Sequence, residues 1–313
     1  MSSLTLHPDK LRHPFKRAYK RFRKPLRCAL IACAALLVAH QTNIDDIAYR
    51  QLAEYITPAE LKDRSIWLNQ YHIDGQPILL DNITEISGLT WSSDTQTLFA
   101  VANDPPRVVE FKPDGQILRI IPLKGFHDVE AITWIGNDTF LVADERRQDV
   151  GQVVIKADTQ TLDRADSPIV TIGIGAGRNK GFEGLAWHPE SQSIFVAKER
   201  DPLTIYRIKG FISESRNNLE VSQDEGLNKA VARDNQDLSG LHLDSRSGNL
   251  LVLSDQSSLL SEITMDGDII SSIDLGWLPG TGITQAEGVA MDDKGDIYIV
   301  EEPNRLYRLT KKK

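Results

Sequence analysis

From about residue 82 onward, hydrophobic and polar residues alternate in short stretches that are separated by polar turns. Alternation with a period of two is typical of β-strands, and turns such as KPDGQ (112–116) carry the Asp-Gly chemistry of tight hairpins. One pattern of two such strands and a turn returns five times. The copies are EISGLTWSSDTQTLFAVAND (85–104), DVEAITWIGNDTFLVADE (128–145), GFEGLAWHPESQSIFVAKER (181–200), DLSGLHLDSRSGNLLVLSD (237–255) and QAEGVAMDDKGDIYIVEE (285–302).

Each copy has a small residue near its start and an acid after its second, apolar strand. Third strands follow, such as RVVEFKP (107–113), and fourth strands, such as ILRIIPL (117–123). Four antiparallel strands every 40–55 residues or so are the signature of β-propeller blades. The small residues, at intervals of 43, 53, 56 and 48, are Gly88, Ala131, Gly184, Gly240 and Gly288.

The repeats predict an all-β fold, a five-bladed β-propeller over residues 65–313, with a six-bladed ring as the less favoured alternative. A diverged sixth blade would have to lie in residues 210–234. The last copy has three strands, so its fourth strand is expected from upstream, either SIWLNQYHI (65–73) or PILL (77–80). Either segment would close the ring and remove an exposed edge.

The N-terminus combines a basic segment with a short apolar run. Residues 1–27 contain nine Lys or Arg and one acid, and predict a basic cytoplasmic tail. Residues 28–40 predict a membrane anchor, although a spanning helix usually has about 20 apolar residues. An uncleaved anchor is preferred over a cleaved signal because no small-x-small site follows; a lipoprotein modified at Cys33 is a further alternative. Residues 41–64 are predicted as a stalk with a short helix.

The rest of the chain is acidic. Of 36 Lys or Arg and 44 Asp or Glu in the protein, residues 28–313 keep 27 and 43, so their formal charge is −16. This balance argues against nucleic acid as a partner, because phosphate contacts need Lys and Arg. Cys28 and Cys33 are the only cysteines, so the propeller has no disulfide framework and no Cys-ligated metal.

The repeated acids are the main candidates for chemistry. In a propeller the first strand of each blade lines the central channel, and the second runs antiparallel beside it. Side chains at the start of the first strand and at the end of the second therefore lie at the same end of the ring. Carboxylates that converge there share protons or bind a cation. The predicted metal ligands, at or two positions before the axial position of each blade, are Glu130, Glu183, Glu287, Asp128, Glu85 and Asp237.

Calcium suits such a set, since it takes 6–8 oxygen ligands, whereas the absence of axial His disfavours zinc. The acids that end the second strands form a second ring, which we interpret as structural, because turn capping or pairing with a neighbouring Arg explains them. Trp91, Trp134 and Trp187 recur at one register and are interpreted as core. No catalytic residue is assigned. The second ring consists of Asp104, Glu145, Glu199, Asp255 and Glu302.

Several stretches together resemble a known family. ISGLTW (86–91), LFAVAND (98–104), GFHDVEAITW (125–134) and VADER (142–146), behind a basic N-terminal anchor, are similar to the SdiA-regulated protein family of the YjiK type. The resemblance implies a five-bladed propeller distantly similar to NHL-repeat propellers, bound calcium and attachment to the bacterial cell envelope. Calcium binding carries over only to the matching blade motifs, chiefly at Glu130, Glu183 and Glu287.

These observations favour a calcium-binding propeller in the periplasm, held at the bacterial inner membrane by a single-pass anchor over residues 28–40. It is expected to act as a binding or scaffold module for a protein or small-molecule ligand that the sequence does not identify. The alternative is a calcium-dependent hydrolase, lactonase- or phytase-like, that uses the metal at the channel mouth. A purely structural ion that holds the blades together is a third possibility.

Overall fold

The computed structural model divides into two compact units, Met1–Pro58 and Ala59–Lys313. The first unit contains a helix over residues 23–34. In the described part of the chain, no helix has both the length and the apolar composition that crossing a membrane requires. Residues 35–40 of the predicted anchor lie outside the described residues. The described residues are 23–34, 52, 55–173, 181–212, 218–276 and 282–311.

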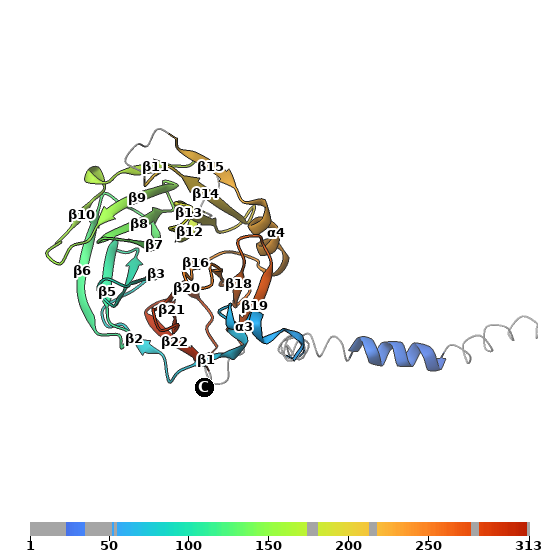
Figure 1. Cartoon of the computed structure of the whole chain (residues 1–313). Coiled ribbons are helices and arrows are strands. Elements are labelled where there is room, and N and C mark those ends of the chain that lie inside the picture. Colours follow the sequence, from blue (N-terminus) through green and yellow to red (C-terminus); the bar gives the residue numbers. More distant parts are fainter. Residues whose placement is uncertain are drawn as a thin grey trace, which may run out of the picture. The chain divides into compact units, whose positions relative to one another are not determined.

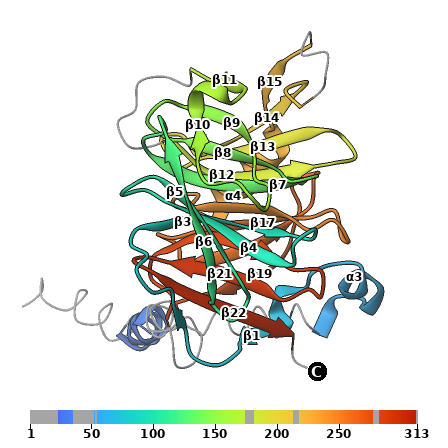
Figure 2. The same cartoon turned by 90° about the vertical axis from the view of Figure 1, so that its left-hand side faces the viewer.

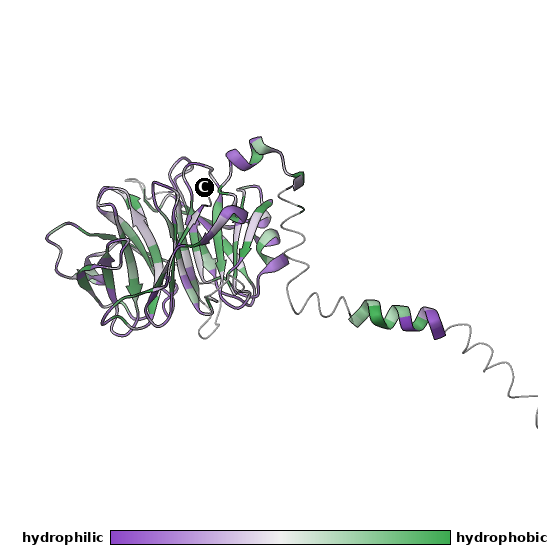
Figure 3. Ribbon diagram, turned by 90° about the horizontal axis from the view of Figure 1, so that it is seen from below, coloured by the Kyte–Doolittle hydropathy of each residue, from purple (hydrophilic) through white to green (hydrophobic). Residues whose placement is uncertain are grey.

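The second unit is a ring of five β-sheets around a central axis (Figure 1). This arrangement confirms the predicted five-bladed β-propeller. The innermost strand of each blade contacts the innermost strands of both neighbouring blades, and β20 (Ala286–Met291) contacts β3 (Ile86–Ser92), so the ring is closed. Figure 2 shows the blades from the side. Hydrophobic residues gather in the strands and hydrophilic ones in the connecting turns (Figure 3).

Blades 1 and 2 are built from consecutive antiparallel strands, as the repeats predict. The connection between the last two strands of blade 2 also adds β10 to the outer edge of blade 1, in parallel to β6. This addition covers an edge strand that would otherwise be open. The strands are β3 (Ile86–Ser92), β4 (Thr97–Ala102), β5 (Arg107–Phe111) and β6 (Ile117–Lys124), then β7 (Val129–Gly136), β8 (Thr139–Asp144), β9 (Asp149–Val154), β10 (Leu162–Asp163) and β11 (Ile169–Thr171).

Blades 3 and 4 follow the same pattern. Between them, residues 210–234 contain β15 and the helix α4 (Glu225–Asp234) and no additional blade among their described residues. Asp224 caps α4 by accepting a hydrogen bond from the Leu227 backbone N–H at 3.1 Å. The strands are β12 (Phe182–His188), β13 (Ser193–Lys198), β14 (Thr204–Lys209), β15 (Glu220–Gln223), β16 (Gly240–Leu243), β17 (Leu250–Ser254), β18 (Leu259–Ile263) and β19 (Ile269–Asp274).

Blade 5 closes the ring with chain from upstream, as predicted. Both candidate segments take part, because each pairs antiparallel with a different portion of β22. The short helix α3 and the 3-10 helices η2 and η3 complete the described elements of this unit. The elements are α3 (Ala59–Asp63), η2 (Leu68–Gln70), β1 (Tyr71–Ile73), β2 (Ile78–Leu79), η3 (Arg164–Asp166), β20 (Ala286–Met291), β21 (Ile297–Glu301) and β22 (Arg305–Lys311).

The upstream segment is also attached to blade 4 through one buried acid. Glu262, in β18, is fully buried. Its carboxylate accepts hydrogen bonds from the backbone N–H groups of Ile66 at 2.8 Å and Trp67 at 2.9 Å. Asn249 Nδ2 at 2.7 Å and Ser271 Oγ at 2.6 Å donate to it as well. Four donors compensate the burial of this charge, so Glu262 holds the closing segment in place.

The hydrophobic core lies between the blades. Five clusters of buried side chains each combine residues of two neighbouring blades. In one of them, for example, Phe99 of blade 1 contacts Phe140 of blade 2, with ring centroids 4.6 Å apart. The stability of the fold therefore depends on completing the ring, because each blade buries its faces only against its neighbours.

The repeated small residues allow the innermost strands to approach one another near the axis. A Cβ atom added to Gly288 would lie 2.7 Å from the backbone carbon of Gly88. A Cβ at Gly88 would in turn lie 2.7 Å from the Glu130 carbonyl oxygen, and Gly88 has a φ of +47°. Any larger side chain at these positions would push neighbouring backbones apart.

We therefore expect Gly288→Ala to lower the free energy of unfolding by about 1–3 kcal/mol, as overpacking usually does. Urea denaturation measures the change. Gly173→Ala is the matched control, because a Cβ there would meet no atom of the described residues within 4 Å. Equal stability of the two variants would contradict the close approach of the innermost strands.

Candidate metal centre

Three glutamates of the first predicted set lie at β-bulges. In β7, the residues on either side of Glu130 pair with consecutive residues of β8, so Glu130 has no partner in the ladder. Glu183 in β12 and Glu287 in β20 are left out of their ladders in the same way. Bulges are often found beside functional sites, where they change the direction of a side chain. This local irregularity therefore positions the three acids.

Acids from both predicted sets line one hollow of about 300 Å³ at the start of the innermost strands. We call this hollow the acidic mouth. Of the described side chains that line it, seven are carboxylates and one is a guanidinium, so negative charge dominates among them. The lining residues are Ser87, Glu130, Glu183, Glu199, Arg200, Asp237, Ser239, Asp255, Gln256, Glu287 and Glu302.

Five carboxylates of blades 2 and 3 form two overlapping groups of three, each of which is close enough to hold a cation. Asp128, Glu130 and Glu145 form one group, in which oxygens from all three residues lie within 4.8 Å of one another. Glu145, Glu183 and Glu199 form a second group by the same criterion. Because Glu145 belongs to both groups, the five acids form a continuous arrangement, which we call the carboxylate row. Carboxylates at this spacing repel one another unless a cation or protons intervene.

Glu130 is oriented by two side chains of blade 1. Ser87 Oγ donates to its Oε2 at 2.6 Å, and Asn103 Nδ2 donates to its Oε1 at 2.6 Å. Burial raises the pKa of Glu130 to about 7, helped by the nearby Glu145 and Asp128 charges and opposed by these two hydrogen bonds. Asn103 Oδ1 is buried and has no hydrogen-bond partner within the described chain. A neutral amide oxygen therefore remains available beside Glu130.

Glu183 and Glu287 lack this support. Across the described ranges of the propeller, neither carboxylate has a hydrogen-bonding or ion-pairing partner. Burial, together with the charges of Glu130 and Glu145, raises the pKa of Glu183 well above its usual range. Burial and the Asp255 charge raise the pKa of Glu287 to about 8. A bound cation would therefore stabilise the ionised form of these two acids the most.

Glu145 and Glu199 were predicted to be structural, and both do make structural contacts. Glu145 accepts a hydrogen bond from the Gly181 backbone N–H at 2.8 Å, and burial raises the pKa of its carboxyl. Glu199 pairs with Arg200 at 2.9 Å. Both acids nevertheless belong to the carboxylate row. In blades 2 and 3, therefore, the structure does not support the predicted division of the acids into metal ligands and purely structural residues.

The remaining acids of the first set have different environments. Asp237 lines the acidic mouth but accepts hydrogen bonds from Ser254 Oγ at 2.5 Å and the Gln256 backbone N–H at 3.1 Å, which fix the turn after β17. Asp128 is part of the carboxylate row and lies 3.3 Å from Arg146. Glu85 is exposed and does not line the mouth.

In the second set, Asp255 and Glu302 line the mouth, whereas Asp104 is exposed and lies outside it. Burial and the Asp237 charge raise the pKa of Asp255 to about 6, although its carboxylate accepts a hydrogen bond from the Ala286 backbone N–H at 3.2 Å. Burial and the Glu85 charge raise the pKa of Glu302.

Blade 1 thus contributes neutral polar groups instead of acids. Asn103, which directly precedes Asp104, was not among the predicted ligands. The only feature of the sequence that could have pointed to Asn103 is its position at the end of the second strand. As an uncharged amide it did not stand out beside the five acids that end these strands.

The donor set of the acidic mouth fits a hard divalent cation. Its lining side chains supply carboxylate, hydroxyl and amide oxygens, and none of them is His or Cys. Oxygen-rich sites of this kind suit calcium, magnesium or manganese rather than zinc or copper. The carboxylate oxygens of Glu183 and Glu287 and the Oδ1 atom of Asn103 have no partner among the described residues, so each is available to ligate a cation.

One family model matches most of the chain. The model described as SdiA-regulated matches residues 63–310, which span the whole propeller. The chain belongs to the SdiA-regulated family. The resemblance seen in the blade motifs is confirmed.

The solved structures that resemble this fold are distant in sequence. A luciferin-regenerating enzyme is 14% identical, with a TM-score of 0.48 over 75% of this chain and 95% of that one. An inactive variant of virginiamycin B lyase from Staphylococcus aureus, with quinupristin, is 17% identical, with a TM-score of 0.42 over 74% and 68%. A gluconolactonase from Xanthomonas campestris is 17% identical, with a TM-score of 0.47 over 82% and 94%. At these values no residue role or activity carries over to this chain.

Proposed function

We propose that this member of the SdiA-regulated family binds calcium at the acidic mouth and acts as a binding or scaffold module. The observation that carries the proposal is the carboxylate row, in which Glu183 has no partner and a strongly raised pKa. Glu130, Glu145, Glu183 and Glu199 would hold the ion, with Asn103 Oδ1 as a neutral oxygen. A bound cation would replace the mutual repulsion of these acids by attraction.

Calcium is preferred over magnesium for reasons of ligand number and geometry. Calcium accepts 6–8 oxygen ligands with flexible geometry, whereas magnesium requires a near-ideal octahedron and retains several waters. The carboxylate row draws its oxygens from two blades and offers more carboxylates than an octahedral magnesium site uses. A site assembled from separate blades therefore suits the larger ion.

A binding role is favoured over catalysis by the charge of the mouth. Among the described residues that line the mouth, Arg200 is the only Lys or Arg, and it already pairs with Glu199. A phosphate ester would find little positive charge there. A calcium-dependent hydrolase remains the second candidate, because Glu287 lines the mouth outside the proposed ligand set, so its carboxylate could act as a general base beside the ion. When bound, the ion would polarise a substrate oxygen.

Thermal melting with and without calcium tests the metal proposal. In metal-free protein the raised carboxyls keep their protons longer in the folded than in the unfolded state, where they ionise near pH 4.3. Their contribution to stability is thus complete below about pH 4.3 and is lost as pH rises through about 7 for Glu130 and about 8 for Glu287. We therefore expect the Tm of chelated protein to fall between pH 5 and pH 8.

Calcium should reverse this loss. At 1 mM and a Kd of about 10 µM it adds about 2.7 kcal/mol, or roughly 5–10 °C in Tm. The gain should be large at pH 8 and small at pH 5, where protons compete for the same oxygens. A Tm that is unaffected by calcium at pH 8 would contradict the proposal. Calcium-dependent turnover of lactones or phosphate esters would instead favour the hydrolase.

We further propose that the propeller faces the periplasm at the bacterial inner membrane. The support is the sequence, in which nine Lys or Arg of residues 1–27 precede the apolar stretch 28–40. Fractionation of cells that express the full chain, or a chain lacking residues 1–40, tests this location. The full chain should sediment with inner membranes and the shortened chain should not. Recovery of both in the same fraction would argue against an anchor.

A further inference from the structure

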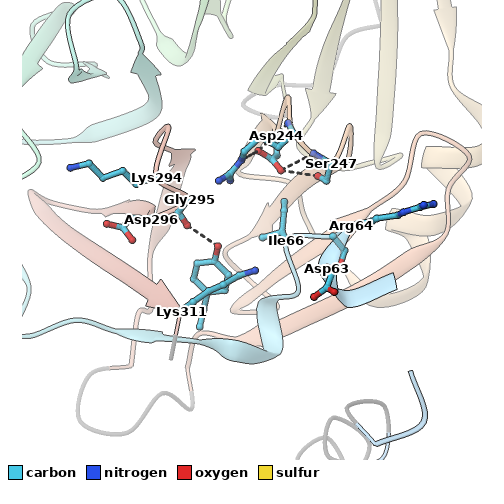
Figure 4. Close-up of a pocket in the computed structure, with 12 residues that line it drawn as sticks. Asp63, Arg64, Ile66, Asp244, Ser247, Lys294, Gly295, Asp296 and Lys311 are labelled. Carbon is cyan, nitrogen blue, oxygen red and sulfur yellow. Dashed lines mark hydrogen bonds and ion pairs between the residues drawn. The ribbon is translucent and has the colours of Figure 1, made fainter. Parts of the chain in front are cut away.

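A second hollow, of about 570 Å³, lies at the end of the innermost strands opposite the acidic mouth (Figure 4). We call it the basic pocket. The segment that closes the ring, the turns that follow β16 and β20, and the end of β22 form its walls. Its volume is within the usual range of ligand sites, about 300–1,000 Å³. Around the ring of small residues between the two hollows, the free space is only about 10 Å³, so they are separate sites.

The charge of the basic pocket is opposite in sign to that of the acidic mouth. Among the described residues that line it, four are Lys or Arg and three are Asp. Two of the acids are compensated, because Asp244 pairs with Arg246 and Asp296 pairs with Arg308, which does not line the pocket. Three cations and one acid remain, without an ion pair to any described residue, and leave an excess of two positive charges. They are Arg64, Lys294, Lys311 and Asp63.

The guanidinium of Arg246 is held in place by its neighbours. Its Nε donates to Asp244 Oδ1 at 2.9 Å, and its Nη2 contacts Met291 Sδ. A Cβ atom added to Gly295 would lie 2.8 Å from Nη1, so the guanidinium is packed against the backbone of this glycine. Within the described chain Nη1 donates to no acceptor, and the side chain is 48% exposed. A fixed guanidinium with unused donors is well suited to bind an oxyanion.

Lys311 places a second positive charge beside Arg246. Its Nζ lies 5.7 Å from the centre of the Tyr71 ring, within the range of a cation–π contact. The Tyr71 hydroxyl donates to the Gly295 carbonyl oxygen at 2.7 Å, which fixes the ring. Partial burial and the Arg246 charge lower the pKa of Lys311, although nearby acids oppose this shift. Two like charges held this close are stabilised by an anion between them.

The other two cations lie at the sides of the pocket. In Figure 4 the side chains of Lys294 and Arg64 extend in opposite directions, and both residues are exposed. They do not converge with Lys311 on one point, but their charges attract an anion toward the pocket. The contact itself therefore depends on Arg246 and Lys311.

We propose that the basic pocket binds a phosphate group, with its oxygens between Arg246 and Lys311. A phosphate monoester carries a charge of about −1.5 to −2 at pH 7, which matches the excess of two positive charges, whereas one carboxylate would neutralise only half of it. Its three terminal oxygens can accept from a guanidinium and an ammonium at once. The remaining volume has room for the organic part of the ligand. This phosphate can belong to a soluble ester or to a lipid headgroup, and the inference does not depend on calcium.

Calorimetric titration of the full chain, freed of metal by a chelating resin, tests the proposal. Metal is removed because phosphate would also bind a calcium ion in the acidic mouth. The probes are inorganic phosphate, glycerol 3-phosphate, dihexanoyl phosphatidic acid and, as a dicarboxylate for comparison, succinate. At least one phosphate probe should bind saturably, and its affinity should fall as the salt concentration rises. If no phosphate probe binds, or if succinate binds more tightly than all of them, the proposal is wrong.

Two of the probes distinguish the sources of the phosphate. Glycerol 3-phosphate and dihexanoyl phosphatidic acid have the same phosphomonoester, but only the second has acyl chains. Tighter binding of the phosphatidic acid assigns the pocket to a lipid headgroup. Equal or weaker binding assigns it to a soluble phosphate ester.

A pair of lysine variants tests the place of binding. Lys311→Gln should weaken phosphate binding roughly tenfold or more, as expected for one lost hydrogen bond between charged groups. Lys229→Gln is the matched control, because it removes the same charge from an exposed position on α4 outside the pocket. It should bind phosphate like the unchanged protein. Equal affinity of the two variants, whether high or low, would overturn the role of Lys311, and an unchanged Tm in both excludes misfolding as the cause of a difference.

Discussion

Glu262→Ala is expected to destabilise the propeller by about 3–5 kcal/mol. The substitution removes the acceptor of four hydrogen bonds from a fully buried position. The backbone N–H groups of Ile66 and Trp67 would then lose the Glu262 acceptor, and each buried donor that stays unsatisfied costs about 1–3 kcal/mol. The closing segment would also lose its attachment to blade 4, so the ring would open more readily.

Urea denaturation followed by tryptophan fluorescence measures this effect. Glu190→Ala is the matched control, because Glu190 is exposed and makes no hydrogen bond to a described residue. The control should change stability by no more than about 0.5 kcal/mol. Glu262→Gln should lie between the two, since its amide keeps one acceptor oxygen. A loss below about 1 kcal/mol in Glu262→Ala would show that the closing segment is held in other ways.

The repeats predict the architecture well because blade number follows directly from the period. Five copies with one incomplete blade require closure by upstream chain, and the structure shows that closure. The choice between residues 65–73 and 77–80 could not be made from sequence, because each forms only a short strand. The structure uses both, since the seven residues of β22 have room for two partners. Nothing in the sequence predicted that Glu262 holds the closing segment, because a polar residue within an alternating strand usually faces solvent.

The candidate site was predictable in outline only. Antiparallel pairing of the first two strands requires both sets of acids to lie at one end of the ring. Side-chain directions at strand ends, in contrast, depend on bulges and turns that the period does not specify. For this reason the sequence did not place Glu145 beside both Glu130 and Glu183, and it included the exposed Glu85.

Glu183→Gln is expected to have opposite effects with and without calcium. In chelated protein at pH 8 the substitution removes a half-buried carboxylate without a partner among the described residues, whose pKa is raised by desolvation and by its charged neighbours. Folded protein should therefore become more stable, by about 1–2 kcal/mol. With calcium present the same substitution removes a ligand and weakens binding on the order of 100-fold, or about 2.7 kcal/mol. A merely structural glutamate would destabilise the fold under both conditions when replaced.

The most direct test of the account is calorimetric titration of the full chain with calcium at pH 8. We expect saturable binding with a Kd of about 10 µM or tighter. Binding should be about 100-fold weaker in Glu183→Gln. It should be unchanged in Glu85→Gln, because Glu85 is exposed and does not line the acidic mouth. No binding by the unchanged protein, or equal binding by all three proteins, would contradict a calcium site at the acidic mouth.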